Sequence, residues 1–215
     1  MVRAALTVGR DVGGLEAVSG AAPVDGAGPV SGGAGGTALA FAIFLGEMMR
    51  EAGVKARFVR GGSTRYLVEM LEEGLTDYIL DGQTFDLEGV RSMRENPGHV
   101  NTSPFTSYNW HGKGNFASMV DVVVLGATEV DVNFNANVVT HSDGRLLHGI
   151  GGWQNCLASR CTILPIPSFR DRIPVLVDEV TTLCGPGELI DVIVTERGII
   201  ERPDRDKIAA HMAAG

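Results

Sequence analysis

Segments with the apolar pattern of buried strands alternate along this chain with segments of helical periodicity, and glycine clusters lie at the junctions between them. The clearest strand is the apolar run at residues 120–125, which predicts a buried, parallel strand. The clearest helix covers residues 38–51, after a glycine-rich turn at 31–36 and with Thr37 as its N-cap. Strands interleaved with helices in this way predict an α/β fold, a three-layer α/β/α sandwich.

The remaining elements follow from the same patterns. Further helices are predicted at residues 64–73, 85–93 and 205–214. Further strands are predicted at residues 55–60, 77–80, 130–134, 162–166, 175–177 and 190–195. Gly61 and Gly62 are predicted to form a tight turn between a strand and a helix. Residues 1–31, rich in glycine, alanine and valine, are expected to be an entry segment of the same domain that continues through residues 32–215.

Composition and charge narrow the class of protein. The chain has 215 residues, of which 44% are hydrophobic, and this is enough for one substantial α/β domain. The net charge is −8 and no basic run occurs, which argues against nucleic-acid binding and against attraction to anionic membranes. No targeting segment and no apolar stretch long enough to span a bilayer is evident. We therefore expect a soluble, cytoplasmic protein.

The cysteines and histidines give no sign of a metal centre. Cys156, Cys161 and Cys184 are odd in number and form no C-x-x-C pair, so buried, reduced thiols are the simpler interpretation. The histidines lack metal-ligand spacing, and we expect no metal. No G-x-S-x-G motif occurs, and no nucleophile–base triad can be argued.

Three glycine clusters, at residues 32–36, 61–62 and 149–152, are placed where strands should give way to helices. In open α/β sheets, ligands gather at the carboxyl ends of the strands, and glycine lets backbone N–H groups approach a phosphate or an oxyanion. None of the clusters matches a phosphate-binding P-loop or a clean G-x-G-x-x-G. Any one of them, taken alone, is better explained as a tight turn without a ligand.

Polar side chains recur at every second position in the segment that follows the apolar run. These residues are Glu129, Asp131, Asn133, Asn135 and Asn137, and they alternate with Val130, Val132, Phe134 and Ala136. At strand spacing the polar residues share one face, and periodicity alone favours a solvated outer face. The segment leads, however, toward the glycine cluster at 149–152, and polar groups beside a glycine loop are what a polar substrate needs.

Four basic side chains could bind a carboxylate or a phosphate. His111 and Lys113 belong to a polar, aromatic loop at residues 101–115, and Arg170 and Arg172 follow a predicted strand. Loops on rigid scaffolds often carry binding residues. An ordinary surface charge explains each of them as well, and for at least one of the two arginines a surface or interface position is the preferred interpretation.

Taken in order, these segments resemble the citrate lyase alpha subunit family, also called citrate CoA-transferase. The resemblance is carried by the residues at 33–40, 61–64, 70–75, 80–86, 94–99, 125–138, 142–144, 149–152, 172–174, 177–178 and 195–199. The most specific run is Leu-Gly-Ala-Thr-Glu-Val-Asp-Val-Asn-Phe-Asn-Ala-Asn-Val at 125–138. The ordered agreement extends from about residue 32 to about residue 203.

The resemblance implies a CoA-transferase fold, related to sugar-phosphate isomerase-like domains, in which two domains stand in tandem with the active site between them. This chain corresponds to the second domain, and the N-terminal partner domain is absent from it. The family reaction exchanges acetyl for citryl on a CoA-derived carrier group, with acetate released. The implied partners are citrate, acetate, an acyl carrier subunit and a lyase subunit of a citrate lyase complex. No nucleic acid and no membrane is expected.

The resemblance also implies which residues form the site. Glu129, Asn133 and Asn135 would supply polar groups, and Gly151 and Gly152 would supply backbone donors for an oxyanion. The CoA-like group would lie against Gly33, Gly35, Gly36, Gly61, Gly62, Gly149 and Gln83. Where many relatives in the wider superfamily have a nucleophilic glutamate, this chain has Asp-Gly-Gln-Thr at 81–84, so direct transfer between bound substrates is expected.

Trp153 is the main departure from the family pattern, which continues after the glycines with histidine and a following aspartate. Two other functions therefore stay open. One is an acyl-CoA transferase or thioesterase acting on a different acid, and Trp153 is its best support. The other is a non-catalytic assembly domain, which the absent partner domain supports.

Overall fold

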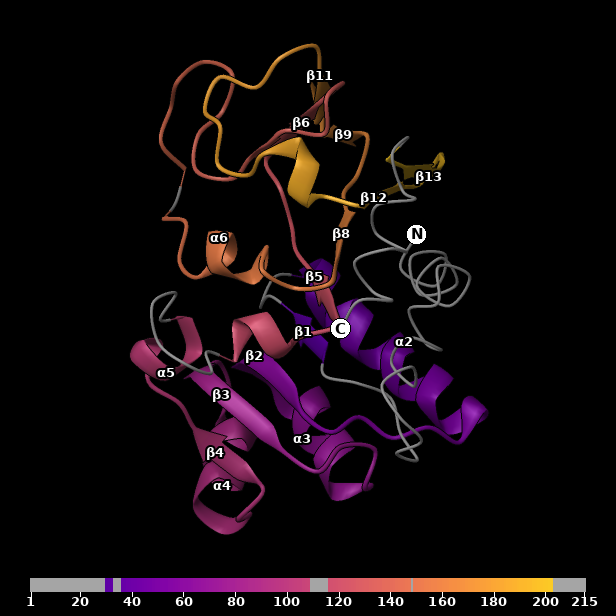
Figure 1. Cartoon of the computed structure of the whole chain (residues 1–215), viewed down its shortest axis with the longest axis vertical. Helices are drawn as coiled ribbons and strands as arrows, with labels where there is room; N and C mark the ends of the chain where they lie inside the picture. Colours follow the sequence, from indigo (N-terminus) through magenta and orange to yellow (C-terminus); the bar gives the residue numbers. More distant parts are fainter. Residues whose placement is uncertain (1–29, 33–35, 109–115, 148, 203–215) are drawn as a thin grey trace.

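An eight-stranded sheet forms the centre of the computed structural model, which describes residues 30–32, 36–108, 116–147 and 149–202 (Figure 1). In spatial order its strands are β13 (Gly198–Glu201), β12 (Val192–Thr195), β8 (Cys161–Pro165), β5 (Val122–Val124), β1 (Val30–Gly32), β2 (Val59–Ser63), β3 (Ile79–Thr84) and β4 (His99–Asn101). All neighbours are parallel except β12 and β13. Every residue of β5, β8 and β12 is buried, as expected of parallel strands that are covered on both faces.

The order of the strands reverses once, between β1 and β5. From β1 the chain builds β2, β3 and β4 outward on one side, and it then returns to pair β5 with the free edge of β1. Such a topological switch point opens a crevice outside the carboxyl ends of the two strands, and ligands of open α/β sheets bind there. The fold thus singles out the segments that follow β1 and β5.

Each face of the sheet carries its own hydrophobic core. One face packs against α2 (Gly36–Ala52) and α3 (Arg65–Glu72) through a cluster that includes Phe41, Leu45, Met49 and Val68. The opposite face packs against α6 (Trp153–Cys156) and against Phe116 and Val120, which flank η1 (Ala117–Met119). Figure 1 shows α2 and α3 on one side of strands β1 to β3 and α6 on the other. The predicted α/β/α layering is confirmed.

Two small sheets extend the second layer beyond the carboxyl ends of the central strands. Their strands are β6 (Glu129–Asp131), β7 (Ala136–Asn137), β11 (Leu176–Val177), β9 (Phe169–Arg170) and β10 (Ile173–Pro174). In Figure 1 β6, β9 and β11 lie at the end of the molecule opposite α4 (Leu87–Glu95). The short helical turn η2 (Gly187–Leu189) precedes β12, and the short helix α5 (Pro104–Tyr108) follows β4.

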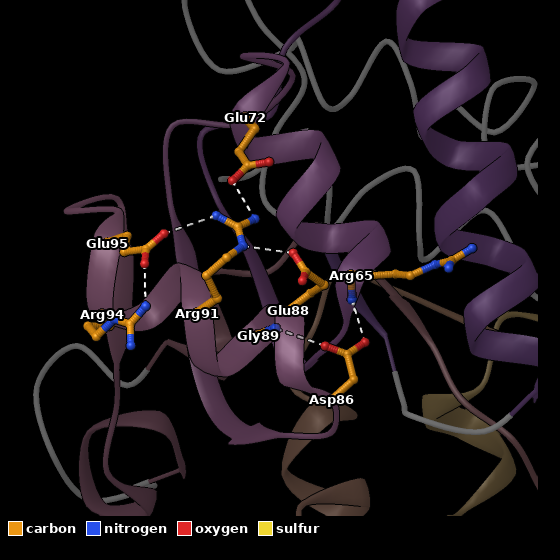
Figure 2. Close-up of polar contacts among 8 residues, drawn as sticks. All are labelled: Arg65, Glu72, Asp86, Glu88, Gly89, Arg91, Arg94 and Glu95. Atoms are coloured by element: carbon orange, nitrogen blue, oxygen red, sulfur yellow. Dashed lines mark hydrogen bonds and ion pairs between the residues drawn. The ribbon is translucent and has the colours of Figure 1, made fainter.

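Asp86 joins the two helices that flank the carboxyl ends of β2 and β3 (Figure 2). Its Oδ1 accepts the N–H of Gly89 at 2.8 Å and so caps α4. Its Oδ2 accepts the N–H of Arg65 at 2.6 Å, in the first turn of α3, where the N-cap residue Thr64 makes no side-chain cap. Around this cap, Arg91 pairs with Glu72 of α3 and with carboxylates of α4. One carboxylate therefore satisfies backbone donors of two helices.

Replacing Asp86 by alanine is expected to lower the free energy of unfolding by about 1 to 2 kcal/mol, because N–H groups of two helix starts lose their acceptor at once. Urea titration monitored by circular dichroism measures this loss. Glu95→Ala is the matched control, since its pairs with Arg91 and Arg94 are exposed and such pairs contribute little. Equal losses in the two variants would contradict the shared cap.

Most predicted elements are confirmed, with shifted bounds. Other predictions are wrong. Thr37 is not the N-cap of α2, because the helix already begins at Gly36. Gly61 and Gly62 do not form a turn but lie inside β2, where the pairing with β3 shifts register. The strand predicted at 77–80, in contrast, is confirmed as β3 with later bounds, Ile79–Thr84. The strand predicted at 130–134 ends at Asp131, because the chain turns back there. The helix predicted at 205–214 lies outside the described residues. Cys156, Cys161 and Cys184 are free and buried, as predicted.

Candidate functional site

The carboxyl ends of four neighbouring strands bring the predicted glycines to one edge of the sheet. Gly32, the last residue of β1, is in register with Gly61 on one side and with Val124 of β5 on the other. In the next pair, Gly62 of β2 is in register with Gln83 of β3. Gly61, Gly62 and Gln83, predicted from separate motifs, therefore lie together, next to the switch point.

The glycines of this region differ in what surrounds them. For Gly126, Gly149 and Gly151, no heavy atom lies within 4 Å of the position that a Cβ would occupy. A Cβ on Gly62, in contrast, would meet the Phe85 ring at 1.9 Å. Gly151 has a φ of 57°, which favours glycine. The three open glycines leave room for a ligand to approach the backbone, and Gly62 is covered by a side chain.

Trp153 connects the glycine loop at 149–152 to the switch point. Its indole Nε1 donates to the carbonyl oxygen of Gly126 at 2.8 Å, two residues after β5. Its ring packs on Gly185, where a Cβ would lie 2.5 Å from the ring. The neighbouring Gln154 donates to the carbonyl of Cys184 at 2.7 Å. Helix α6 is thus held at two points, and the loop before it lies beside Gly126.

Glu129 is fully buried, and its carboxylate accepts hydrogen bonds from β7 and from the loop that follows β7. The backbone N–H of Ser142 donates to Oε1 at 2.8 Å, and the Ser142 hydroxyl donates to the same oxygen. Asn137, the cross-strand partner of Glu129, donates its side-chain amide to Oε2 at 3.3 Å. Nδ1 of His141 lies 3.8 Å from Oε1. These contacts make Glu129 the anchor of the segment that follows β7.

The side chains of Asn133 and Asn135 do not lie on one strand face with Glu129, because β6 and β7 form a hairpin instead of one continuous strand. The turn is organised by Asp131, whose Oδ1 accepts the N–H groups of Asn133 and Asn135 at 2.8 and 3.0 Å. Asn133 is exposed, and Asn135 accepts the N–H of Gly187 with its side-chain oxygen. Val132, predicted on an apolar face, is 72% exposed. The predicted five-residue polar face does not exist.

A buried carboxylate that the sequence did not single out as a site lies within β3. Asp81 accepts the hydroxyls of Ser63 and Thr84 at 2.9 and 2.7 Å and the N–H groups of Ser63 and Gln83 at 3.3 and 2.9 Å. His99 Nε2 lies 3.5 Å away. Burial by itself raises the pKa of Asp81, but the nearby His99 and the hydrogen bonds from Thr84, Ser63 and Gln83 outweigh it and lower the pKa from 3.8 to about 2. Asp81 is therefore ionised, and it fixes the ends of β2 and β3 beside Gly62.

A second such group is Arg60, which is 1% exposed in the middle of β2. Its side chain points toward the α6 layer, with Nη1 3.9 Å from the sulfur of Cys156. The Arg60 guanidinium thus places a positive charge between β2 and α6, the helix that follows the glycine loop at 149–152. For both Asp81 and Arg60, the only sign in the sequence was a charged residue within or directly after an apolar segment predicted as a strand.

The other predicted site residues have different outcomes. Gly36 is the first residue of α2, and Gly152 is the N-cap residue of α6. Arg170 donates to the carbonyl of Ala127 at 3.2 Å, so it belongs to the switch-point region, whereas Arg172 is exposed. Gly33, Gly35, His111 and Lys113 lie outside the described residues.

Within the described ranges, no group of three or more histidine, cysteine or carboxylate side chains is arranged to hold a metal ion. Of the helices that the structure describes, none is both long and apolar enough to cross a bilayer.

The comparisons with known proteins agree with the resemblance seen in the motifs. A family model described as citrate lyase, alpha subunit, matches residues 20–214. The chain is 41% identical over 181 residues to the citrate lyase alpha chain of Escherichia coli K12, which covers 84% of this chain and 36% of that one. It spans about a third of the length of the curated citrate lyase alpha chains it matches.

Solved structures give the same result. A structure described as the alpha subunit of citrate lyase from Streptococcus mutans, in complex with citrate, superimposes with a TM-score of 0.84 at 34% identity and covers 99% of this chain and 41% of that one. The alpha subunit of a malonate decarboxylase from Acinetobacter baumannii superimposes with a TM-score of 0.67 at 17% identity, covering 99% and 47%, and this likeness concerns the fold alone. This chain belongs to the citrate lyase alpha subunit family.

Proposed function

We propose that this chain supplies half of the site of a citrate CoA-transferase, which exchanges acetyl for citryl on a CoA-like thioester. The observation that carries the proposal is the set of open glycines at the switch point, Gly126, Gly149 and Gly151, in a member of this family. The substrates are citrate and an acetyl thioester of CoA or of a CoA-derived carrier group. The other half of the site is proposed to come from the N-terminal domain of a full-length subunit.

The proposed reaction proceeds in two acyl transfers. A citrate carboxylate oxygen attacks the acetyl carbonyl carbon, the C–S bond breaks, and the thiolate leaves with its electron pair, which gives a mixed citric–acetic anhydride. The thiolate then attacks the citryl carbonyl of the anhydride, and acetate leaves. No proton or electron is gained or lost overall. Each attack develops an oxyanion, which needs preorganised N–H donors, and holding both reactants together supplies much of the acceleration.

The geometry supports different roles for the predicted residues. Gly149 and Gly151 are proposed to lie against the acyl group or the carrier, because no heavy atom lies near the positions of their absent Cβ atoms. Gly152, the N-cap residue of α6 that follows them, is proposed to share this role. Glu129 is proposed to act through the loop it anchors, because its oxygens accept hydrogen bonds from Ser142 and Asn137. Asn133, exposed in the hairpin turn, remains a proposed contact to substrate.

Turnover with acetyl-CoA and citrate tests the proposal. The chain is assayed alone and joined to the N-terminal domain of a citrate lyase alpha chain, and citryl-CoA is measured by liquid chromatography. Citryl-CoA formed only in the joined protein is the expected result. Transfer to another acid but not to citrate would point to a different transferase, and release of CoA without an acceptor acid would point to a thioesterase. Binding of a carrier protein without any turnover would favour an assembly domain.

The partner subunits are a separate part of the proposal. A carrier subunit bearing the CoA-derived group and a lyase subunit are proposed to assemble with the full-length protein. Co-purification of the joined protein with both subunits, compared with carrier alone, measures this assembly without depending on turnover.

Gly151→Ala is expected to lower kcat of the joined protein about tenfold, because a Cβ at a φ of 57° forces the glycine loop to move. The loss of stability should be about 1 kcal/mol. Gly74→Ala is the matched control, since Gly74 also has a positive φ and open space but follows α3. Steady-state kinetics and thermal unfolding of both variants check this. If Gly74→Ala lowers kcat as much, the glycine loop has no special role.

A further inference from the structure

The segment that follows the switch-point strand β5 carries two backbone donors for which none of the described residues supplies an acceptor. Among the residues that the structure describes, none accepts a hydrogen bond from the N–H of Gly126 or of Ala127. Gly126 is exposed, with no heavy atom within 4 Å of the position that a Cβ would occupy, whereas Ala127 is 6% exposed. Backbone N–H groups of buried residues are nearly always paired. An unpaired donor at the mouth of the switch point is therefore a feature that needs an acceptor.

Two side chains fix the direction in which this donor points. Trp153 Nε1 donates to the carbonyl of Gly126 at 2.8 Å, and Arg170 Nη2 donates to the carbonyl of Ala127 at 3.2 Å. In a planar trans peptide the carbonyl of one residue and the N–H of the next point in opposite directions. With the Gly126 carbonyl held by the indole, the N–H of Ala127 points away from Trp153.

The next peptide is fixed as well, since the N–H of Thr128 donates to the carbonyl of Asn137 at 2.8 Å. The segment 126–128 is thus held by side chains from α6 and β9 and by the backbone of β7. A hydrogen bond accepted by a carbonyl also polarises its own peptide, which makes the N–H on the other side a stronger donor. Trp153 both orients and strengthens the donor of Ala127.

We propose that the N–H of Ala127 donates to the acyl carbonyl oxygen of the bound thioester, and that Trp153 is the positioning residue that aims it. The inference rests on the proposed transfer reaction and assigns its oxyanion donor to the segment after β5, in addition to the glycine loop at 149–152. It also gives Trp153 a function in the chemistry through Gly126, without contact to the substrate. The ligand that this donor selects is a thioester carbonyl, and free CoA lacks that group.

Trp153→Phe in the joined protein tests the positioning role, because phenylalanine keeps an aromatic ring at this position and lacks the indole N–H. The smaller ring also gives up part of the packing on Gly185, so thermal unfolding of the variant is measured beside its kinetics. We expect kcat to fall about 10- to 100-fold with KM for acetyl-CoA changed less than about threefold, since the donor acts mainly on the developing oxyanion. Gln154→Ala is the matched control, because it frees the same helix from Cys184 and leaves Gly126 untouched. An unchanged kcat in Trp153→Phe, or an equal fall in both variants, overturns the inference.

Intrinsic fluorescence tests the same contact without turnover. This chain has two tryptophans, so in a joined protein in which Trp110 and any tryptophan of the added domain are replaced by phenylalanine, the emission reports Trp153 alone. We expect acetyl-CoA to shift this emission and free CoA to leave it unchanged, because only the thioester carbonyl engages the peptide that the indole holds. Equal responses to both ligands, or none to either, overturn the inference. A shift with acetyl-CoA in a protein that forms no citryl-CoA would overturn the proposed citrate reaction and keep the thioester donor.

Discussion

Replacing Asp81 by asparagine is expected to lower the free energy of unfolding at pH 7 by about 2 to 3 kcal/mol. The pKa of Asp81 is lowered from 3.8 to about 2, and each unit of difference corresponds to about 1.4 kcal/mol. Asparagine removes the charge, and its NH2 group would face the donors of Ser63 or Gln83. Urea unfolding followed by circular dichroism measures the loss. Asp77→Asn is the matched control, since the Asp77 pair with Lys55 is exposed.

The pH dependence of this loss has a defined sign. Because the pKa in the folded state lies below 3.8, the ionised Asp81 stabilises the fold at every pH well above 3.8. The contribution fades as the pH falls from about 4 toward about 2, where the carboxyl group is protonated in both states. The stability difference between the protein and Asp81→Asn should therefore be constant from pH 7 to pH 5 and shrink below pH 4. A difference that stays constant down to pH 3 would contradict an ionised, hydrogen-bonded Asp81.

The central sheet and its helices were predictable because their signals are local. The apolar run at 120–125 contains β5, and the periodic segment at 38–51 lies within α2. Helix α2 also ends as its sequence indicates, at Gly53 with a φ of 66°. Strand β4 was missed because three residues of mixed polarity, His-Val-Asn, carry no period.

The hairpin at 129–137 was missed for a different physical reason. Polar residues at every second position predict a strand face, but here Asp131 uses its side chain to hold the backbone of a turn. Phe134 adopts a φ of 66°, a left-handed conformation that is rare for a bulky residue and could not be predicted from its type. The alternation is thus the pattern of a turn joined to two short strands, and the pattern alone cannot distinguish the two.

The candidate site was predictable in its glycines and not in its side-chain contacts. Gly61, Gly62 and Gln83 converge because parallel strands end at one edge, which strand order alone explains. The contact of Trp153 with Gly126 spans 27 residues, and the contact of Asp81 with Ser63 spans 18. Such contacts depend on the packing of α6 and on the register between β2 and β3, and no local pattern encodes them.

Gly187→Ala is expected to be the most destabilising glycine substitution in the described chain, at about 3 kcal/mol. A Cβ there would lie 1.9 Å from the backbone oxygen of Asn133 and 2.9 Å from the carbonyl carbon of Phe134. Backbone atoms of a hydrogen-bonded turn cannot move aside as a flexible side chain can, so the overpacking falls at the upper end of its usual range. Moving the turn would also break the bond from the Gly187 N–H to Asn135.

Alanine substitutions at two other glycines serve as references for the stability loss expected in Gly187→Ala. Gly62→Ala should cost less, although its Cβ also meets an atom at 1.9 Å, because that atom belongs to the half-exposed ring of Phe85, which can rotate away. Gly46→Ala, inside α2 with contacts no closer than 3.5 Å, should raise stability by up to about 1 kcal/mol. Urea unfolding of the three variants gives the order. If Gly187→Ala is as stable as Gly62→Ala, the backbone of the hairpin turn can move to make room for the Cβ. The contact with η2 would then not fix the positions of Asn133 and Asn135.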